Sequence, residues 1–532
     1  MTITKIKLLF LLLQIFFGTN LVAQQLTVPY TFENNSEYAD GEIYIGLVGK
    51  FGETGDVWMR LTDSSLQEMN ADDNTVPGPE WSTPSDWLYP DIFTKLSDID
   101  EKTIQIPQGL YACRIFISFE SPMYLRFHET GGYAGANLNS DTDPNDGIRW
   151  EIVELTWGDS GLWTNTSRVD AYQYPMALEV NGYSGGLESD SYEESYSIAT
   201  SGSGTAEFKK IGELLSHQDI LEKWDEEVSD SYLVAKTIKT HSYDGEPIIE
   251  QPSKVAEFSD DVLDDYIDEI WDTYSQHDLN INIGDRGTWV GRVNSDGEFK
   301  FTDPADGTIA TIYWKPSTVD ALEGSGSLAY TPYDASENVE AYNEDLMIQA
   351  QISAAITRHA IYTDIIDETI QYSHDASRYF IYSPYNEYVK YFHDNEVSYD
   401  SKTYAFAYDD VGDHSSTIQT TFPIDVKVII GGYGDNGFIE ITEENEEFED
   451  NLENTLAIYP NATNGVNPQL VGFEGEVYVS IYGLDGMYIN SELVSEEDLF
   501  TIETIGLATG VYYIVAYQKT GLTRKTFKLL VN

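Results

Sequence analysis

Residues 26 to 200 alternate between apolar and polar side chains, and this pattern constrains the fold more than any other feature of the chain. Glu42 to Val48 and Thr103 to Ile106 are examples, and Pro107-Gln108-Gly109 is a turn signal after the second run. Helical periodicity is scarce in this region, and Gly, Tyr, Val and Thr are abundant. The region therefore predicts a β-sandwich or β-barrel.

The middle of the chain mixes helical and strand patterns. Apolar residues at helical spacing predict helices over Phe208 to Leu221, Ser259 to Tyr274 and 337 to 362. The stretch from Ser189 to Gly204 is rich in Ser, Glu and Gly, and we interpret it as a loop. Short strands are expected at Thr288 to Val293, Ile309 to Trp314, Tyr404 to Tyr408 and Val426 to Ile430. The middle is therefore predicted to be α+β.

Both ends differ from this body. Met1 to Ala23 has the charged start, apolar stretch and small-residue end of a secretory signal peptide. Glu443 to Glu453 is predicted to be a solvated acidic linker, and about seven short strands follow from Leu456. We expect a signal peptide at 1–23, a β-barrel region at 24–204 with further strands from 400–435, a mixed α/β region at 205–435, a linker at 436–455 and a small all-β domain at 456–532.

The charge of the chain limits its partners. The formal net charge is −62, from 29 basic and 91 acidic residues. Phosphate binding needs a basic surface, so a nucleic-acid partner is excluded and an anionic membrane is disfavoured. A neutral polymer suits this charge, although solubility or adaptation to a salty medium is the favoured explanation of it. No segment after the signal peptide is long and apolar enough to span a membrane, and we expect a monomer.

Residues that often carry nucleophilic or metal chemistry are sparse. Cys113 is the only cysteine, and its apolar neighbours predict a buried structural thiol in a strand. Asp141 to Gly147 resembles a calcium loop, but its Gly is one place late and no bidentate Glu follows, so a plain turn is favoured. The eight histidines show no metal-ligand spacing. We therefore expect no metal and no cofactor.

Two carboxylates stand in strand-like runs on either side of a turn signal at 158–161. Glu154 shares a face of its predicted strand with Ile152 and Thr156. Asp170 is predicted to share a face with Arg168 and Tyr172. A pair of carboxylates facing one groove, with Trp157 and Trp163 beside them, is what glycosidic hydrolysis requires. Taken singly, each carboxylate also fits a solvent-facing or salt-bridged structural role.

A second acidic pair, Asp409-Asp410, ends the aromatic run that begins at Tyr404. Its oxygens would accept hydrogen bonds from sugar hydroxyls. A turn after a strand explains the same residues.

Several blocks appear in a fixed order between about Thr27 and Asp435. They are Trp150 to Thr156, Asn165 to Asp170 with a proline at 175, Leu263 to Tyr274, Gly291 to Val293, Lys315 to Thr318, Ala354 to Arg358, Tyr385 to Tyr388 with His393, and Tyr404 to Val411. Together they resemble glycoside hydrolase family 64, the β-1,3-glucanases. The resemblance implies a thaumatin-like β-barrel or sandwich joined to a mixed α/β domain across a wide cleft.

The resemblance also implies roles for single residues. Glu154 matches the general acid of an inverting mechanism and Asp170 its general base. Inversion needs room for a water, so the two carboxyls are expected about 6.5–9.5 Å apart. The positions that match glucan contacts are Thr156, Trp163, Ser167, Asp409 and Asp410. The implied products are short laminari-oligosaccharides, such as laminaripentaose, from laminarin, curdlan or fungal wall glucan. Gly158, where a polar residue is more usual, leaves the product length open.

The C-terminal segment resembles another family. The carrying residues are Ile458 to Gly465, Val479 to Gly486, Leu507 to Tyr513 and Lys525 to Leu530. They resemble the sorting domain of the type IX secretion system, which implies the Sec route and then transport by that machinery across the outer membrane. A carbohydrate-binding or adhesive β-sandwich is the alternative for this segment. For the whole chain, the alternatives to a secreted glucanase are a thaumatin-like glucan-binding protein without catalysis and a surface adhesin.

Overall fold

The computed structural model describes residues 25–434, apart from 53–54, 187–188, 190 and 365–369, and short segments between 457 and 531. The chain divides into two compact units, Met1–Ile439 and Glu440–Asn532, and each is considered by itself. The expected signal peptide and acidic linker lie outside the described residues. Among the described residues, no helix has the length and apolar character needed to cross a membrane.

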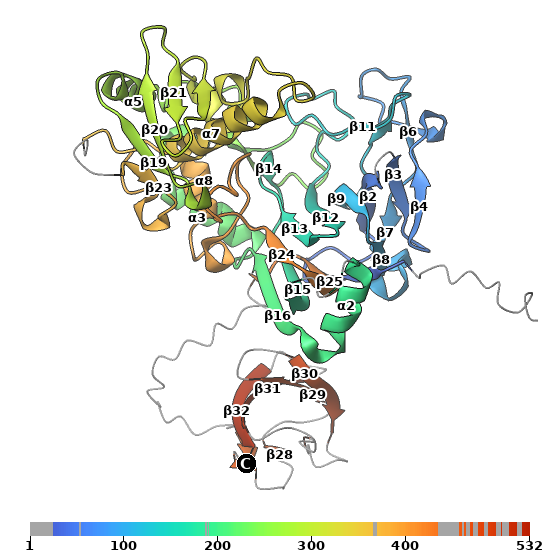
Figure 1. The fold of residues 1–532 in the computed structure, drawn as a ribbon. Coiled ribbons are helices and arrows are strands. Elements are labelled where there is room, and N and C mark those ends of the chain that lie inside the picture. Colours follow the sequence, from blue (N-terminus) through green and yellow to red (C-terminus); the bar gives the residue numbers. More distant parts are fainter. Residues whose placement is uncertain are drawn as a thin grey trace, which may run out of the picture. The chain divides into compact units, whose positions relative to one another are not determined.

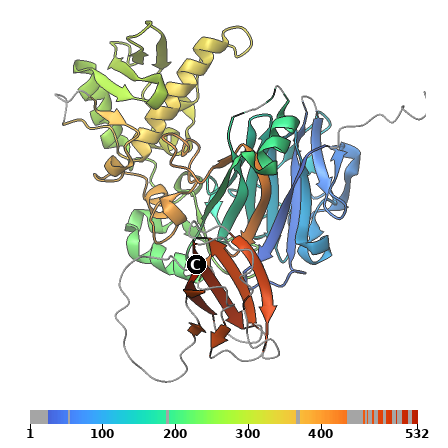
Figure 2. The same ribbon diagram turned by 60° about the horizontal axis from the view of Figure 1, so that its bottom comes forward.

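Two facing β-sheets make up one half of the first unit (Figures 1 and 2). The five-stranded sheet has the order β16 (Thr205–Gly212), β15 (Met176–Ser184), β25 (Phe422–Ile430), β1 (Thr27–Asn34) and β8 (Thr103–Pro107). The eight-stranded sheet has the order β24 (Ile418–Thr420), β13 (Gly161–Thr166), β12 (Trp150–Gly158), β9 (Leu110–Phe119), β2 (Ile43–Phe51), β3 (Gly55–Arg60) and β4 (Ser65–Glu68), and β7 (Thr94–Lys95) pairs with β2. Two-stranded sheets join β5 (Asn74–Pro77) with β6 (Leu88–Pro90), and β10 (Arg126–Phe127) with β11 (Tyr133–Ala134).

The alternation in the sequence accounts for this packing. Every second residue of β1 is buried, and Tyr30 meets Leu155 and Trp157 of β12 in the core between the sheets. Cys113 on β9 is a free, buried thiol in the same core, as predicted. The strand β25, late in the chain, lies between β15 and β1 and runs parallel to β1. Strands from both ends of the first unit therefore complete one sandwich.

The other half of the first unit is α+β (Figure 1). Its mixed sheet has the order β22 (Ile309–Ile312), β21 (Phe299–Thr302), β20 (Thr288–Val293), β19 (Leu279–Asn282) and β23 (Tyr372–Ser373), and β14 (Ala171–Tyr172), β18 (Ile248–Glu250) and β17 (Lys236–Thr237) form a smaller sheet. The helices are α3 (His217–Glu227), α4 (Asp230–Leu233), α5 (Asp264–Gln276), α6 (Thr318–Glu323), α7 (Val339–Thr357) and α8 (Glu387–Phe392). Ile270 of α5 and Ile352 of α7 pack with Trp289 in one core. The helices predicted over Ser259 to Tyr274 and 337 to 362 are thus confirmed.

Three local predictions are wrong. Residues 205–212 form the strand β16 instead of the start of a helix, because they pair with β15 along its length, and only α3 is helical. The expected loop at 189–204 contains α2 (Tyr192–Ile198) and a π-helical turn (Ala199–Ser203), and the side chain of Ser191 caps α2 by accepting from the Glu194 N–H. Tyr404 to Tyr408 is a loop and turn instead of a strand.

The second unit is described only in part. Its strands are β26 (Ala457–Tyr459), β27 (Ala462–Thr463), β28 (Gln469–Val471), β29 (Val477–Gly483), β30 (Tyr488–Val494), β31 (Gly510–Gln518) and β32 (Arg524–Val531). Five of them form a sheet in the order β27-β32-β31-β29-β30, and β26 pairs with β28. Val479, Ile514 and Leu529 are buried together. The rest of the blocks that resemble a sorting domain lies outside the described residues.

Candidate active site

The register of β12 places Glu154. The neighbours Val153 and Leu155 point into the core between the sheets, so Glu154 lies on the opposite face with Ile152 and Thr156, as predicted. The strand ends at Gly158 and β13 begins at Gly161, which confirms the turn. Gly161 has φ +104°, a conformation that favours glycine, and a Cβ there would lie 2.4 Å from the Thr420 carbonyl oxygen. Glu154 is therefore fixed by the pairing of the sheet.

Two cross-strand neighbours hold the Glu154 carboxylate. Glu154 lies opposite Arg114 of β9 and opposite Asn165 of β13. The Arg114 Nε donates to Oε1 at 3.1 Å, and the Asn165 Nδ2 donates to Oε2 at 3.3 Å. Burial lowers the pKa of Arg114, but Tyr133 and Glu154 raise it by more, so this guanidinium stays charged. Sequence reasoning missed Arg114, whose signal is a charged residue within an apolar strand.

A β-bulge lies next to Glu154. Tyr111 and Ala112 of β9 together oppose the single residue Thr156, and Ala112 has φ +45°. The Ala112 N–H donates to the Thr156 Oγ1 at 3.1 Å. Trp163 lies opposite Thr156 on β13, and 42% of its surface is exposed. The bulge therefore leaves a half-exposed hydroxyl and an exposed indole beside the carboxylate.

Asp170 lies in a bend between β13 and β14, not in a strand. The expectation that it shares a face with Arg168 and Tyr172 is wrong, because both of those side chains are fully buried whereas Asp170 is exposed. Its backbone carbonyl accepts from the Gln251 N–H at 3.0 Å. The bend points the Asp170 side chain away from the buried pair.

Arg168 holds this bend from within. Its Nε and Nη2 donate to the two carboxylate oxygens of Glu213 at 2.9 and 2.7 Å, and its Nη1 donates to Glu151. Its backbone N–H donates to the Tyr404 carbonyl at 2.7 Å, and its carbonyl accepts from the Tyr388 hydroxyl at 2.7 Å. Burial raises the pKa of Glu151, and Arg168 opposes that shift. The segment that carries Asp170 is thus fixed by a buried ionic cluster.

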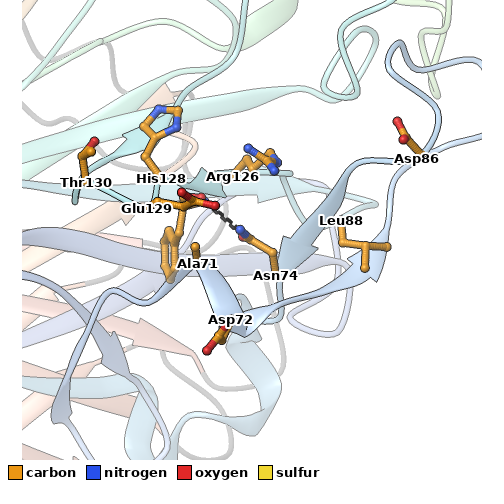
Figure 3. Close-up of a pocket in the computed structure, with 10 residues that line it drawn as sticks. Ala71, Asp72, Asn74, Asp86, Leu88, Arg126, His128, Glu129 and Thr130 are labelled. Carbon is orange, nitrogen blue, oxygen red and sulfur yellow. Dashed lines mark hydrogen bonds between the residues drawn. The ribbon is translucent and has the colours of Figure 1, made fainter.

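One cavity borders both Asp170 and Arg114, the residue that binds Glu154. It has a volume of about 500 Å³, and its lining includes Arg114, Trp150, Ile152 and Asp170. Glu154 is not itself among the lining residues, but its carboxylate accepts from the Nε of Arg114, which is. A smaller cavity of about 180 Å³ also borders Trp150 and Asp170. The cavity in Figure 3 is a different one, between β5, β6 and β10, and contains none of the predicted site residues.

The acidic pair 409–410 has two different environments. Asp409 is fully buried and accepts from Arg358 Nη2 at 3.0 Å, from the Ala405 N–H at 2.8 Å and from His393 Nε2 at 2.9 Å. Burial alone would raise the pKa of Asp409, but His393, Arg358 and that N–H together hold it below its usual value. The oxygens of Asp409 are therefore already satisfied inside the protein, and its expected contact with glucan stays a prediction.

Asp410 is exposed, and desolvation of its carboxyl raises its pKa. The neighbouring Tyr404 is affected by burial first and then by the charges of Asp410, Asp409 and Glu154, which raise its pKa. The Tyr404 carbonyl, at the start of this loop, accepts from the N–H of Arg168, two residues before Asp170. Ser167 is buried, in contrast to Thr156 and Trp163, so it offers little surface to a ligand.

No group of three or more His, Cys, Asp or Glu side chains suited to a metal ion is found in the part of the chain that the structure describes. The polar and aromatic side chains that line the cavity include Lys50, Asp56, Arg114, Tyr133, Trp150 and Asp170.

Known proteins resemble the whole first unit. The family model described as β-1,3-glucanase, glycoside hydrolase family 64, matches residues 26–430. A β-1,3-glucanase domain of this family from Clostridium beijerinckii is 26% identical, covers 76% of this chain and 98% of its own, and has a TM-score of 0.62. A laminaripentaose-producing β-1,3-glucanase solved with laminaritetraose, at 23% identity, covers 76% and 99% with a TM-score of 0.56, and shows a similar fold.

Curated relatives agree with this assignment. A glucan endo-1,3-beta-glucosidase of Cellulosimicrobium cellulans is 24% identical over 332 residues, which are 60% of this chain and 52% of the relative. A protein of the same name from Arthrobacter sp. shows the same identity and coverage. The chain spans about half the length of these relatives. Because the family model matches well over half of the sequence, the chain belongs to glycoside hydrolase family 64, the β-1,3-glucanases.

Proposed function

We propose that this protein is an inverting endo-β-1,3-glucanase that cleaves laminarin, curdlan or fungal wall glucan into short laminari-oligosaccharides such as laminaripentaose. One observation carries the proposal: Asp170 and the Arg114 that binds Glu154 line the same cavity, in a chain of this family. The acidic character of the protein, with a net charge of −62, suits a neutral polysaccharide.

In this mechanism Glu154 is the general acid and protonates the leaving glucosyl oxygen. Asp170 is the general base and activates a water on the opposite face of the sugar. Arg114 and Asn165 orient the Glu154 carboxylate through its two oxygens. Asp170 is exposed on a bend fixed by Arg168, so a water can reach it while the backbone holds its position. Inversion follows if both groups act in one displacement, with the water between them.

Thr156, Trp163 and Asp410 are proposed as the substrate contacts. The exposed indole of Trp163 offers a face for a glucose ring, and Asp410 offers acceptor oxygens for its hydroxyls. Ser167 and Asp409 are buried and are proposed to support the site from behind.

The test is to incubate the chain from residue 24 with linear β-1,3-glucan and to follow the products by chromatography and anomeric NMR. Release of α-anomeric oligosaccharides establishes hydrolysis and inversion together, and their main length reports the number of subsites. β-Anomers would contradict the role of Asp170 as a base for water. Binding without any product would favour the non-catalytic glucan-binding alternative.

We further propose that residues 1–23 direct the chain to the Sec route and that 456–532 direct it through the type IX secretion system. The support is the resemblance of the C-terminal segment to a sorting domain and its β-rich described strands. Deletion of 456–532 should leave glucanase activity intact and stop export from the native host. Secretion of the truncated chain would overturn the sorting role.

A further inference from the structure

Three exposed aromatic side chains lie together on the α+β half. Trp314 follows β22, and Tyr330 and Tyr333 precede α7, with 44%, 43% and 41% of their surfaces exposed. The ring centroids of Trp314 and Tyr330 are 4.8 Å apart, and Tyr330 meets Tyr313 edge to face at 5.6 Å. The Tyr333 N–H donates to the hydroxyl of Thr331, the residue after Tyr330, at 3.3 Å. We call Trp314, Tyr330 and Tyr333 the aromatic platform.

Buried polar side chains of α7 hold the platform in place. Asp345 accepts from the Thr311 N–H at 2.7 Å, the Tyr313 hydroxyl at 2.8 Å and the Thr331 hydroxyl at 2.7 Å. Gln349 donates to the carbonyls of Thr311 and Tyr330, at 3.1 and 2.6 Å. Both segments that carry the rings are therefore anchored to one helix. Rings that are fixed before binding lose little conformational entropy when a ligand stacks on them.

The platform is connected to the candidate active site. The Tyr408 hydroxyl donates to the Leu328 carbonyl at 3.2 Å. Tyr408 directly precedes Asp409 and Asp410, and Leu328 is two residues, at most about 7 Å of extended chain, from Tyr330. The loop that carries Asp410 and the segment that carries Tyr330 are therefore hydrogen-bonded to each other.

We propose that the aromatic platform binds a stretch of β-1,3-glucan outside the sugars that react, and so holds the polymer on the enzyme. This inference rests on the proposed function. Tyr and Trp rings present an apolar face with a polar edge, which suits the apolar faces and hydroxyl rims of sugar rings. The strong negative charge of the chain disfavours a polyanion as the occupant.

A second exposed indole provides a matched control. Trp87, which is 40% exposed, lies on the sandwich, and the guanidinium of Arg126 covers its ring at 4.6 Å from the centroid. Leu88 and Arg126 also line the separate cavity of Figure 3, between β6 and β10. Trp87 therefore resembles Trp314 in type and exposure but belongs to another surface.

The experiment compares Trp314→Ala/Tyr330→Ala with Trp314→Phe/Tyr330→Phe, Trp87→Ala and the unmodified chain. Binding to insoluble curdlan and the kcat and KM for soluble laminarihexaose are measured for each. We expect the double alanine variant to bind curdlan about tenfold more weakly and to keep its turnover of the hexasaccharide. The phenylalanine variant, which keeps both rings, and Trp87→Ala should retain most of the curdlan affinity.

Two outcomes overturn the platform while leaving the proposed function intact: unchanged curdlan binding by the double alanine variant, or an equal loss of hexasaccharide turnover, which would make the rings part of the cleavage subsites. An unmodified chain that binds curdlan through these rings but releases no product would contradict the proposed function and support the platform. An unmodified chain that does not bind curdlan would overturn the platform, and the proposed function falls as well only if laminarihexaose is also left uncleaved.

Discussion

Glu154 and Asp170 are held by two different parts of the molecule in two different ways. Glu154 stands on the strand β12, where the register alone sets its neighbours Arg114 and Asn165. Asp170 stands on a bend that depends on the buried Arg168, with its bonds to Glu151 and Glu213. The difference shows that a strand positions a carboxylate through its hydrogen-bonded pairing with neighbouring strands. A bend needs buried charged side chains to achieve the same.

The two arrangements differ in energy. The Arg114–Glu154 pair is partly exposed, and such pairs contribute about 0–1 kcal/mol to stability. The cluster around Arg168 is buried, and removal of one partner from a buried ionic cluster costs about 3–5 kcal/mol. Substitutions around Glu154 should therefore affect catalysis more than stability. Substitutions in the cluster around Arg168 should affect both.

The largest effect is expected from the two carboxylates themselves. Glu154→Gln and Asp170→Asn should each lower kcat on β-1,3-glucan at least about a hundredfold, because general acid and base groups contribute that much or more. Binding of glucan, measured on immobilised polymer, should survive. Asp159→Asn, in the exposed turn after β12, is the matched control and should keep its activity. A variant at 154 or 170 that keeps more than a few per cent of activity would refute that residue's role.

Arg168→Met is expected to have the next largest effect. It leaves Glu151 and Glu213 without their buried cation and should lower the free energy of unfolding by about 3–5 kcal/mol. Urea unfolding measures this change. Arg60→Met removes an exposed surface pair with Asp63 and should leave the urea unfolding curve almost unchanged. Equal losses in the two variants would show that the Arg168 cluster is not what fixes the bend.

The setting of Glu154 on its strand was predicted better from the sequence than the setting of Asp170 on its bend. Glu154 follows from local alternation, since its face is decided by residues within the same run. Asp170 was singled out as a candidate carboxylate, but it was placed on a strand face with Arg168, whereas it lies exposed on a bend. That error arises because the partners of Arg168 lie elsewhere in the sequence. Glu213 is 45 residues away, and Glu151 lies on β12. Hydrophobic periodicity in the sequence gives no information about charged residues that meet only in the folded chain.

The same limit explains why the sequence did not distinguish the two residues of the acidic pair. Asp409 and Asp410 are adjacent and identical in type, so the sequence analysis predicted the same role, a sugar contact, for both. Arg358 and His393, from the ends of α7 and α8, select Asp409 for burial and leave Asp410 exposed. The wrong secondary-structure predictions have related causes in tertiary contacts. Residues 205–212, for example, form a strand because they pair with β15.

Asp409→Asn tests this buried partner set. The change leaves Arg358 without its buried carboxylate and should lower stability at neutral pH by about 3 kcal/mol. The pKa of Asp409 is depressed in the folded protein, so its contribution is present above the unfolded value of 3.8 and is lost as the pH falls through the folded value. The stability difference between the native chain and Asp409→Asn should therefore shrink below about pH 4. A difference that stays constant down to pH 2 would contradict the ionised, paired state of Asp409.

Arg114→Met should have the smallest effect on stability and so gives the sharpest form of the comparison. The Glu154 ladder remains when the guanidinium is removed, so the free energy of unfolding should change by less than about 1 kcal/mol. The carboxylate loses one of its two side-chain partners, and we expect kcat to fall about tenfold with little change in KM, because orientation of the acid matters in the transition state. A stability loss as large as that of Arg168→Met would mean that the strand side also relies on charge, and that register alone does not hold Glu154.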